Sequence, residues 1–311
     1  MSSKVFLITG ATGKQGGAVI DALLKDANHA NSTILAVTRN VDSPSSKNLS
    51  SKSPTIKLIQ GNLDDVPAIF AKAAEVVKQQ PIWGVYSVQI SQGKGVTYDG
   101  EIKQGKALID ESVKNGVAHF VYGSIDRGGE EESWENRTPV LHFGTKFVVE
   151  RYLRENAGVG VGGMKWTILR PVAFMDNLEP NFQTKVFLAA LSNNLSQKPL
   201  QWVATKDIGI FASKAFADPD KYNHKAIGLA GDELNVAEIS ATFKKVTGED
   251  VAPTYWFLGS ILTTLIGDLG AMVRWFGTDG YGVDIGKARE LHPGLMGMER
   301  WIREESQFVV R

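Results

Sequence analysis

Short runs of β-branched and other apolar residues alternate with helical patterns along the first half of the chain. Six runs predict strands: Val5–Thr9, Ile34–Thr38, Ile56–Gln60, Trp83–Val88, His119–Gly123 and Trp166–Arg170. Helical patterns lie between them at Gly16–Lys25, Val66–Lys78, Asp99–Lys114 and Pro139–Asn156. The strand runs are apolar almost throughout, which is typical of a parallel sheet covered on both faces. We therefore predict an α/β fold, a doubly wound parallel sheet of Rossmann type.

The second half of the chain is less regular. Helical patterns cover Asp207–Ala217, Val236–Val246 and Leu258–Phe276, short strands are expected at Leu200–Ala204 and Lys225–Leu229, and Ile285–Phe308 reads as helical around residues 292–294. We expect a Rossmann domain over residues 1–170 and a smaller α+β lobe over 171–311, interleaved with it and not joined by a flexible linker. Two polar segments, Asp42–Pro54 and Arg127–Arg137, are expected to be exposed loops.

Composition excludes several classes of site. The 311 residues include 34 acidic and 34 basic side chains, so no broad electrostatic surface for nucleic acid or anionic lipid is expected. The absence of cysteine rules out disulfides and thiolate metal sites, and the five histidines lack metal-binding spacing. The longest uncharged stretch, residues 251–267, is just short of a membrane span. We expect a soluble cytoplasmic protein, with the nucleus as a further location, and leave its oligomeric state open.

The segment Thr9-Gly10-Ala11-Thr12-Gly13-Lys14-Gln15-Gly16 follows the first predicted strand and opens the first helix. Such a glycine-rich turn brings backbone N–H groups close to a pyrophosphate, because a Cβ at these positions would obstruct the approach. The third glycine lets the helix pack tightly on the strand. An ordinary glycine-rich turn is the alternative, but the position within a strand–helix–strand unit favours a dinucleotide site.

The end of the second strand bears on the choice of dinucleotide. NAD-binding folds usually place an acidic residue there for the ribose 2′-hydroxyl, whereas this chain has Thr38-Arg39-Asn40. A guanidinium suits a 2′-phosphate, so we predict NADP(H) in preference to NAD(H); a solvated loop arginine is the alternative. Gly61-Asn62-Leu63 after the third strand and Val88-Gln89 after the fourth are further candidate contacts, since ligands of such sheets lie at the strand carboxyl ends.

Three side chains are candidates for chemistry. Ser124 follows the fifth strand, and His142 and Lys146 lie four residues apart on a predicted helix, so they share one helical face. The order matches reductases that use Ser, Tyr and Lys in a Y-x-x-x-K pattern, except that His142 stands in place of the tyrosine. His142 is a candidate proton donor, Lys146 a cofactor contact and electrostatic catalyst, and Ser124 a hydrogen-bond donor to a substrate oxygen. A helix histidine without a catalytic role is the alternative for His142.

Together these features resemble the NmrA-like family of atypical short-chain dehydrogenases/reductases, over essentially the whole chain. The resemblance rests on Gly10–Gly16, Thr38–Asn40, Gln104-Gly105-Lys106, the His142 and Lys146 pair, and Leu169–Asn177. It implies NADP(H) binding, with Lys146 bonded to the nicotinamide ribose and Pro171 and Phe174 flanking the nicotinamide. The complete set of expected cofactor-binding residues is Thr9, Gly10, Thr12, Gly13, Lys14, Gln15, Gly16, Thr38, Arg39, Asn40, Gly61, Asn62, Leu63, Val88, Gln89, Lys146, Pro171 and Phe174.

Two functions follow from the resemblance. Some relatives reduce isoflavones, triphenylmethane dyes and other apolar aromatics, whereas the regulatory members lack the reductase tyrosine, sense dinucleotides and bind protein partners. We expect an NADPH-dependent reductase of a small apolar carbonyl or enone; a redox sensor that regulates a protein partner is the alternative. We interpret the apolar stripes at residues 255–266 and 272–276 as part of the core. The alternative is that they line a substrate site or form a surface for a partner protein.

Overall fold

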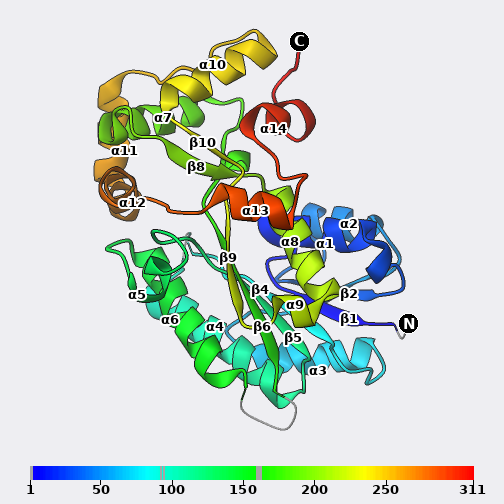
Figure 1. Ribbon diagram of the computed structural model, residues 1–311. Helices are drawn as coiled ribbons and strands as arrows, with labels where there is room; N and C mark the ends of the chain where they lie inside the picture. Colours follow the sequence, from blue (N-terminus) through cyan, green and yellow to red (C-terminus); the bar gives the residue numbers. More distant parts are fainter. Residues whose placement is uncertain (1–2, 92, 94, 159–162) are drawn as a thin grey trace. The chain divides into compact units, whose positions relative to one another are not determined.

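The computed structural model describes residues 3–91, 93, 95–158 and 163–311, and its largest element is a seven-stranded sheet of order β3-β2-β1-β4-β5-β6-β9 (Figure 1). The strands are β1 (Val5–Ile8), β2 (Thr33–Thr38), β3 (Ile56–Gln60), β4 (Gly84–Ser87), β5 (His119–Gly123), β6 (Lys165–Pro171) and β9 (Lys225–Leu229). Neighbouring strands from β3 to β6 pair in parallel. The strand order reverses between β1 and β4, which confirms the predicted doubly wound Rossmann sheet.

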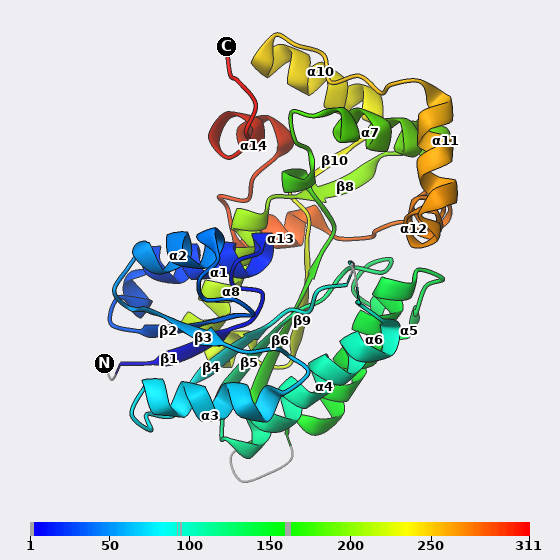
Figure 2. The ribbon, with the colours of Figure 1, turned by 180° about the vertical axis from the view of Figure 1, so that it is seen from behind.

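Helices cover both faces of this sheet. Figures 1 and 2 show α1, α2 and α8 along one face and α3, α4 and α6 along the other. Their bounds, with α9, are α1 (Lys14–Lys25), α2 (Pro44–Ser51), α3 (Val66–Val76), α4 (Tyr98–Lys114), α6 (Leu141–Asn156), α8 (Thr205–Ala217) and α9 (Pro219–Tyr222), and a 3-10 turn covers Ala27–His29. All four residues of β1 are buried, as the continuous apolar run Val5–Ile8 predicts for a central strand.

The chain divides into two compact units that exchange segments. The first unit holds residues 1–124, 145–169 and 208–227, and the second holds 125–144, 170–207 and 228–311. The first unit therefore contains most of the large sheet, and the second contains most of the C-terminal half of the chain. Helix α6 begins in the second unit and continues into the first.

The second unit is built on a three-stranded sheet of order β10-β8-β7. Its elements are α5 (Glu132–Glu135), β7 (Ala173–Phe174), a 3-10 turn (Met175–Asn177), α7 (Phe182–Leu195), β8 (Leu200–Val203), β10 (Asp232–Leu234), α10 (Val236–Thr247), α11 (Trp256–Leu265), α12 (Gly267–Thr278), α13 (Ile285–Leu291) and α14 (Met298–Glu304). Trp202, Phe243 and Trp301 are buried in its apolar core. Gly259 permits close packing of α11 on α7, because a Cβ there would lie 2.5 Å from the backbone nitrogen of Ala190.

The segment Asp42–Pro54 is not a loop, contrary to the sequence prediction. It contains α2, whose first residue is Pro44 and whose N-cap is Ser43, which accepts a hydrogen bond from the backbone N–H of Ser46. Leu49 is buried on the inner side of this helix. The prediction was wrong because it relied on the polar, serine-rich composition of the segment. The Ser43-Pro44 sequence, which is typical of the start of a helix, was the better indicator.

The expectation that Arg127–Arg137 is an exposed loop was wrong in part, because only its acidic residues and Arg137 are exposed. The side chains of Arg127 and Ser133 are completely buried, and α5 forms within the segment. The Arg127 guanidinium donates to the backbone carbonyls of Ile125, Ser133 and Asn136, so the charge is satisfied by local backbone oxygens.

The apolar pattern at Leu258–Phe276 forms two helices, not one. Helices α11 and α12 meet near Ile266 at an angle of 119°. Over the described residues, no single helix is long and apolar enough to cross a membrane. Among them, only α11 and α12 taken together, as a bent pair, have the required length and apolar composition.

Candidate functional site

A pocket of about 610 Å³ lies at the carboxyl ends of four strands of the large sheet, within the first unit. The predicted residues that line it are Thr9, Gly10, Thr12, Thr38, Arg39, Asn40, Gly61, Asn62, Leu63 and Val88. They follow β1, β2, β3 and β4, so the pocket is centred where the strand order reverses. Open α/β sheets bind their ligands at this position.

Thr9 joins the two strands on either side of the reversal. Its hydroxyl donates to the Val88 carbonyl at 2.9 Å and accepts from the Val88 backbone N–H at 2.8 Å. The Tyr86 hydroxyl, from β4, donates to Oε1 of Gln15 on α1 at 3.1 Å. Burial raises the pKa of Tyr86, so the hydroxyl remains protonated as this donor. These bonds tie the end of β4 to the turn and helix that follow β1.

The glycine turn has the geometry that a bound anion requires. Gly10 has φ +59°, and a Cβ there would lie 2.7 Å from Cγ1 of Val88. A Cβ on Gly16 would lie 2.3 Å from the Gly10 carbonyl oxygen, so this glycine allows the turn to fold back against α1. Gly13 is the N-cap of α1, and no side chain among the described residues caps the helix. Because no side chain caps the helix at its first residue, Lys14, an anion could take the place of a cap there.

Arg39, directly after β2, lines the pocket together with Ser43 and Ser45. Its side chain is exposed, and its guanidinium has no acidic partner within the part of the chain that the structure describes. Lys47, the other basic residue of this segment, pairs with Asp42 at 3.6 Å. Arg39 is therefore the basic group that the lining of this pocket offers to a ligand.

Asp64 completes the wall beside Asn62. Its two carboxylate oxygens accept from the side-chain amides of Gln104 and Asn62, each at 2.7 Å. Gln104 belongs to α4, so this bond fastens the start of that helix to the end of β3.

Lys146 does not line the pocket but pairs with a residue that does. Its Nζ lies 2.7 Å from Oε1 of Glu101, in the first turn of α4, and the two side chains are 9% and 2% exposed. The Tyr122 ring lies beneath the ammonium group, with its centroid 5.7 Å from Nζ. Glu101 was not anticipated from the sequence, because nothing in the spacing connects it with Lys146.

Ser124 is buried, and its hydroxyl donates a short hydrogen bond to Glu150 on α6. Glu150 is fully buried, so this bond satisfies a carboxylate that would otherwise be costly to bury. The proton of Ser124 is thus directed toward the protein interior.

His142 lies in the second unit, where its Nδ1 pairs with the Asp268 carboxylate at the start of α12. The other oxygen of Asp268 accepts from the backbone N–H of Leu141 at 2.9 Å. Burial raises the pKa of Asp268, but the hydrogen bond and charge of His142 and the Leu141 N–H outweigh it and lower the pKa overall. Asp268 was not anticipated either, because 126 residues separate it from His142.

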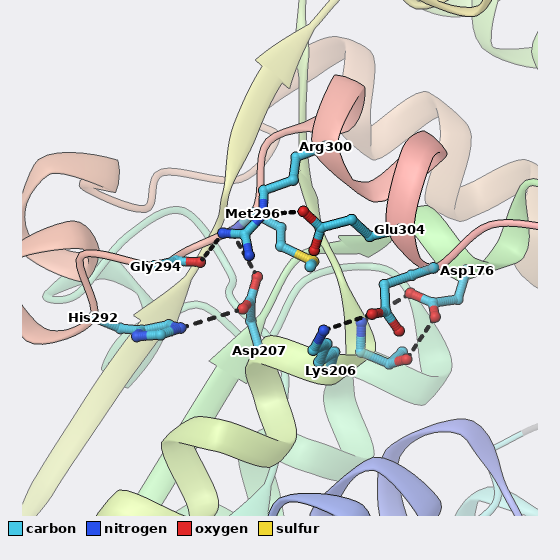
Figure 3. Close-up of polar contacts among 10 residues, drawn as sticks. Asp176, Lys206, Asp207, His292, Gly294, Met296, Arg300 and Glu304 are labelled. Carbon is cyan, nitrogen blue, oxygen red and sulfur yellow. Dashed lines mark hydrogen bonds and ion pairs between the residues drawn. The ribbon is translucent and has the colours of Figure 1, made fainter. Parts of the chain in front are cut away.

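A second buried polar cluster in the same unit surrounds Asp207 (Figure 3). Its carboxylate accepts from the backbone N–H of Met296 at 2.9 Å and lies 3.5 Å from Nε2 of His292. Burial raises the pKa of Asp207 to about 6, against the opposing effects of the Met296 N–H and the Arg300 and Lys206 charges. Neighbouring Thr205 donates to Asp176 at 2.7 Å. The cluster joins the start of α8 to the C-terminal segment.

The remaining predicted residues are distributed as follows. Gly13, Lys14, Gln15 and Gly16 form the start of α1, and buried Gln89 donates to Ser87 at 2.9 Å. Pro171 and Phe174 belong to the second unit, as His142 does. The pocket residues outside the predicted set are Val37, Ser43, Ser45, Asp64, Ile90, Gly95, Val96, Thr97, Gly100, Glu101 and Gln104. No group of three side chains suited to a metal ion occurs within residues 3–91, 93, 95–158 and 163–311.

Comparison with known proteins identifies the family of the chain. The sequence pattern of the NmrA-like family matches residues 2–302. The NmrA-like family domain-containing oxidoreductase hkm9 of Aspergillus hancockii is 25% identical over 80% of this chain and 74% of its own. The nitrogen metabolite repression protein nmr of Neurospora crassa is 26% identical over 80% of this chain, which spans 54% of that protein.

Solved structures agree on the fold. NmrA, described as a negative transcriptional regulator, superposes in complex with NAD at a TM-score of 0.71, with 20% identity over 98% of this chain and 96% of NmrA. A complex of NmrA with NADP is also known. The Citrobacter sp. triphenylmethane reductase complexed with NADP(H) superposes at 0.70, with 15% identity over 97% of this chain and 99% of the reductase.

Proposed function

Because the chain belongs to the NmrA-like family, we propose that it binds NADP(H) in the pocket of the first unit and reduces a small apolar or aromatic carbonyl or enone. The observation that carries the proposal is the uncapped start of α1, directly after the left-handed turn at Gly10 and beside the strand-order reversal. A pyrophosphate there would accept from the N–H groups of the first turn and gain from the helix dipole.

The preference for NADP(H) over NAD(H) is supported by Arg39. NmrA has been crystallised with NAD and with NADP, so relatives alone do not decide between the two. Arg39 lines the pocket beside the hydroxyl-bearing Ser43 and Ser45. A guanidinium and two hydroxyls match the charge and acceptor oxygens of a 2′-phosphate. The two acidic residues of the lining are engaged elsewhere, Asp64 by Asn62 and Gln104 and Glu101 by Lys146.

We assign the remaining predicted contacts to parts of the dinucleotide. Thr9, Thr12, Gly13, Lys14, Gln15 and Gly16 would surround the pyrophosphate; Thr38, Asn40, Gly61, Asn62 and Leu63 would surround the adenosine; Val88 and Gln89 would meet the nicotinamide-side ribose. Lys146 would hold that ribose, and Pro171 and Phe174 would flank the nicotinamide.

When bound, the reduced nicotinamide supplies a hydride, and the protein must position the acceptor and provide a proton. We assign the proton to His142, whose Nδ1 is held by Asp268. This contact fixes the orientation of the ring and favours a proton on Nδ1, as carboxylates do for histidines in other active sites. Lys146 would stabilise developing negative charge on the substrate oxygen. Ser124 would join them only if its hydroxyl turned away from Glu150.

Apolar surface beside His142 supports an apolar substrate. Leu141, Leu265 and Ile266 are 63%, 78% and 48% exposed. Asp268, which follows Leu265 and Ile266 in the chain, accepts a hydrogen bond from the backbone N–H of Leu141 and so connects the two segments. Exposed apolar side chains next to a polar pair are typical of a binding site for an organic ring.

The alternative is a dinucleotide sensor that regulates a protein partner without turnover. It is supported by the missing tyrosine and by the nmr relative. We favour the reductase because a titratable side chain stands at the tyrosine position and is oriented by the partly buried carboxylate of Asp268.

Turnover separates the two functions. The protein would be incubated with NADPH and a panel of aromatic ketones, quinones and enones, and NADPH absorbance followed for the wild type, Lys146→Ala and the exposed control Lys103→Ala. A reductase consumes NADPH and loses about 100-fold or more in Lys146→Ala, but not in the control. NADPH binding without consumption across the panel contradicts the reductase. The sensor fails in turn if the proteolysis pattern of the protein is the same with and without dinucleotide.

A further inference from the structure

The Lys146–Glu101 pair places two opposite charges beside the pocket, out of reach of solvent. Both side chains are at least nine-tenths buried, and Nζ and Oε1 meet at 2.7 Å. The two atoms are not aligned for a hydrogen bond, so they attract each other as charges. The N–H groups of Lys146 do not point at a hydrogen-bond acceptor. A buried charge is costly unless it is compensated, and here each member compensates the other.

Gly105, one turn after Glu101 on α4, makes the Lys146–Glu101 contact possible. A Cβ on Gly105 would lie 2.8 Å from Cγ2 of Val149. Gly105 therefore allows α4 to approach α6, the helix that carries Val149 and Lys146. The close approach of these helices is what brings Glu101 within contact distance of Lys146.

Charge decides what this pair does to a dinucleotide. The oxidised nicotinamide ring is a cation, and the reduced ring is neutral. A buried ammonium group near the ring repels the oxidised form and leaves the reduced form almost unaffected, whereas a buried carboxylate does the opposite. A neutral pair does neither.

We propose that Glu101 determines the selectivity of the pocket between oxidised and reduced dinucleotide. By neutralising Lys146 it allows the cationic nicotinamide of NADP⁺ to bind next to a lysine. The inference rests on the proposed function, in which Lys146 holds the nicotinamide ribose. It holds whether the bound dinucleotide is turned over or only sensed.

Binding of NADP⁺ and NADPH to the full-length protein tests this selectivity. Dissociation constants for both would be measured by calorimetry with the wild type, Glu101→Gln, Lys146→Met and the double variant. Glu111→Gln is the matched control, since Glu111 lies on the same helix and pairs with Lys114 at 2.9 Å. We expect Glu101→Gln to raise the ratio of the NADP⁺ constant to the NADPH constant about tenfold, as a single charge several ångströms away would.

The other variants complete the test. Lys146→Met should lower the ratio, and the double variant, again uncharged, should return it to near the wild-type value, as should Glu111→Gln. Ratios that stay constant in both single variants while they fold and bind would overturn the inference and leave Glu101 a structural partner. If Glu101→Gln does not fold, Lys146→Met against the double variant gives the same comparison. Failure of the wild type to bind either dinucleotide would instead overturn the proposed function.

Discussion

Asp268 holds His142 from the start of another helix: one carboxylate oxygen pairs with Nδ1 of His142, and the other accepts from the backbone N–H of Leu141 at 2.9 Å. The same carboxylate thus caps the first turn of α6 and orients its histidine. Two long-range contacts converge on one side chain that the sequence pattern does not single out.

Asp268→Asn should weaken the fold at neutral pH and little in acid. The folded pKa of Asp268 is lowered, so its stabilisation is present above the unfolded value of 3.8 and is lost as pH falls through the folded pKa. We expect a loss of about 1–3 kcal/mol in the free energy of unfolding at pH 7, which shrinks toward pH 3. Denaturant unfolding at both pH values measures it, with Asp279→Asn, at the other end of α12, as control. An equal loss at both pH values would refute the ion-pair account.

Arg39→Ala should reduce NADPH affinity about 10–100-fold and leave NADH affinity nearly unchanged. A charge-assisted contact to phosphate is worth about 1.5–3 kcal/mol, and only NADPH carries the 2′-phosphate. Fluorescence titration with both dinucleotides measures the effect. Lys47→Ala is the control, because its ammonium group is engaged by Asp42. Equal losses for NADPH and NADH would exclude the assigned 2′-phosphate site.

Gly10→Ala should destabilise the protein by about 1–3 kcal/mol and abolish dinucleotide binding. The new methyl group would lie 2.7 Å from Val88 Cγ1 on backbone with φ +59°. Gly17→Ala is the comparison, since its Cβ would make an ordinary contact at 3.6 Å with the Ala11 carbonyl oxygen. Thermal unfolding with and without NADPH reads both effects. Similar behaviour of the two variants would mean that the turn does not need its left-handed glycine.

Asp207 gives the second unit a pH dependence of the opposite sign. Its pKa rises from 3.8 to about 6 on folding because of burial, so the folded state favours the protonated form. The free energy of unfolding of the wild type should rise by up to about 3 kcal/mol, relative to that of Asp207→Asn, as pH falls from 8 to 4. His292, Arg300, Lys206 and Asp176 face this group and remain in both proteins. A stability difference that does not change with pH would show that Asp207 titrates normally.

The sequence was sufficient for the sheet and for much of the pocket. Strand runs such as Val5–Ile8 are buried on both faces, so periodicity and turn chemistry alone identify them, and the strand ends then point to Thr9, Arg39 and Val88. The partners of the candidate catalytic side chains could not be predicted in this way. Glu101 and Asp268 meet Lys146 and His142 through tertiary packing, which leaves no regular spacing in the sequence.

Local composition misled where a few specific contacts decide the structure. Serine-rich residues 42–54 contain a helix because Ser43 caps it and Leu49 is buried beneath it. Arg127 lies in a polar segment but is buried, since three backbone carbonyls accept its guanidinium protons. The average polarity of a segment, from which we predicted exposure, does not reveal a helix cap or a buried arginine.

Calorimetric titration of the wild-type protein with NADP⁺, NADPH, NAD⁺ and NADH tests the central claim most directly. The account predicts one site per chain that binds the 2′-phosphorylated forms at least tenfold more tightly than the others. The absence of heat and of thermal stabilisation with any of the four at millimolar concentration would contradict it.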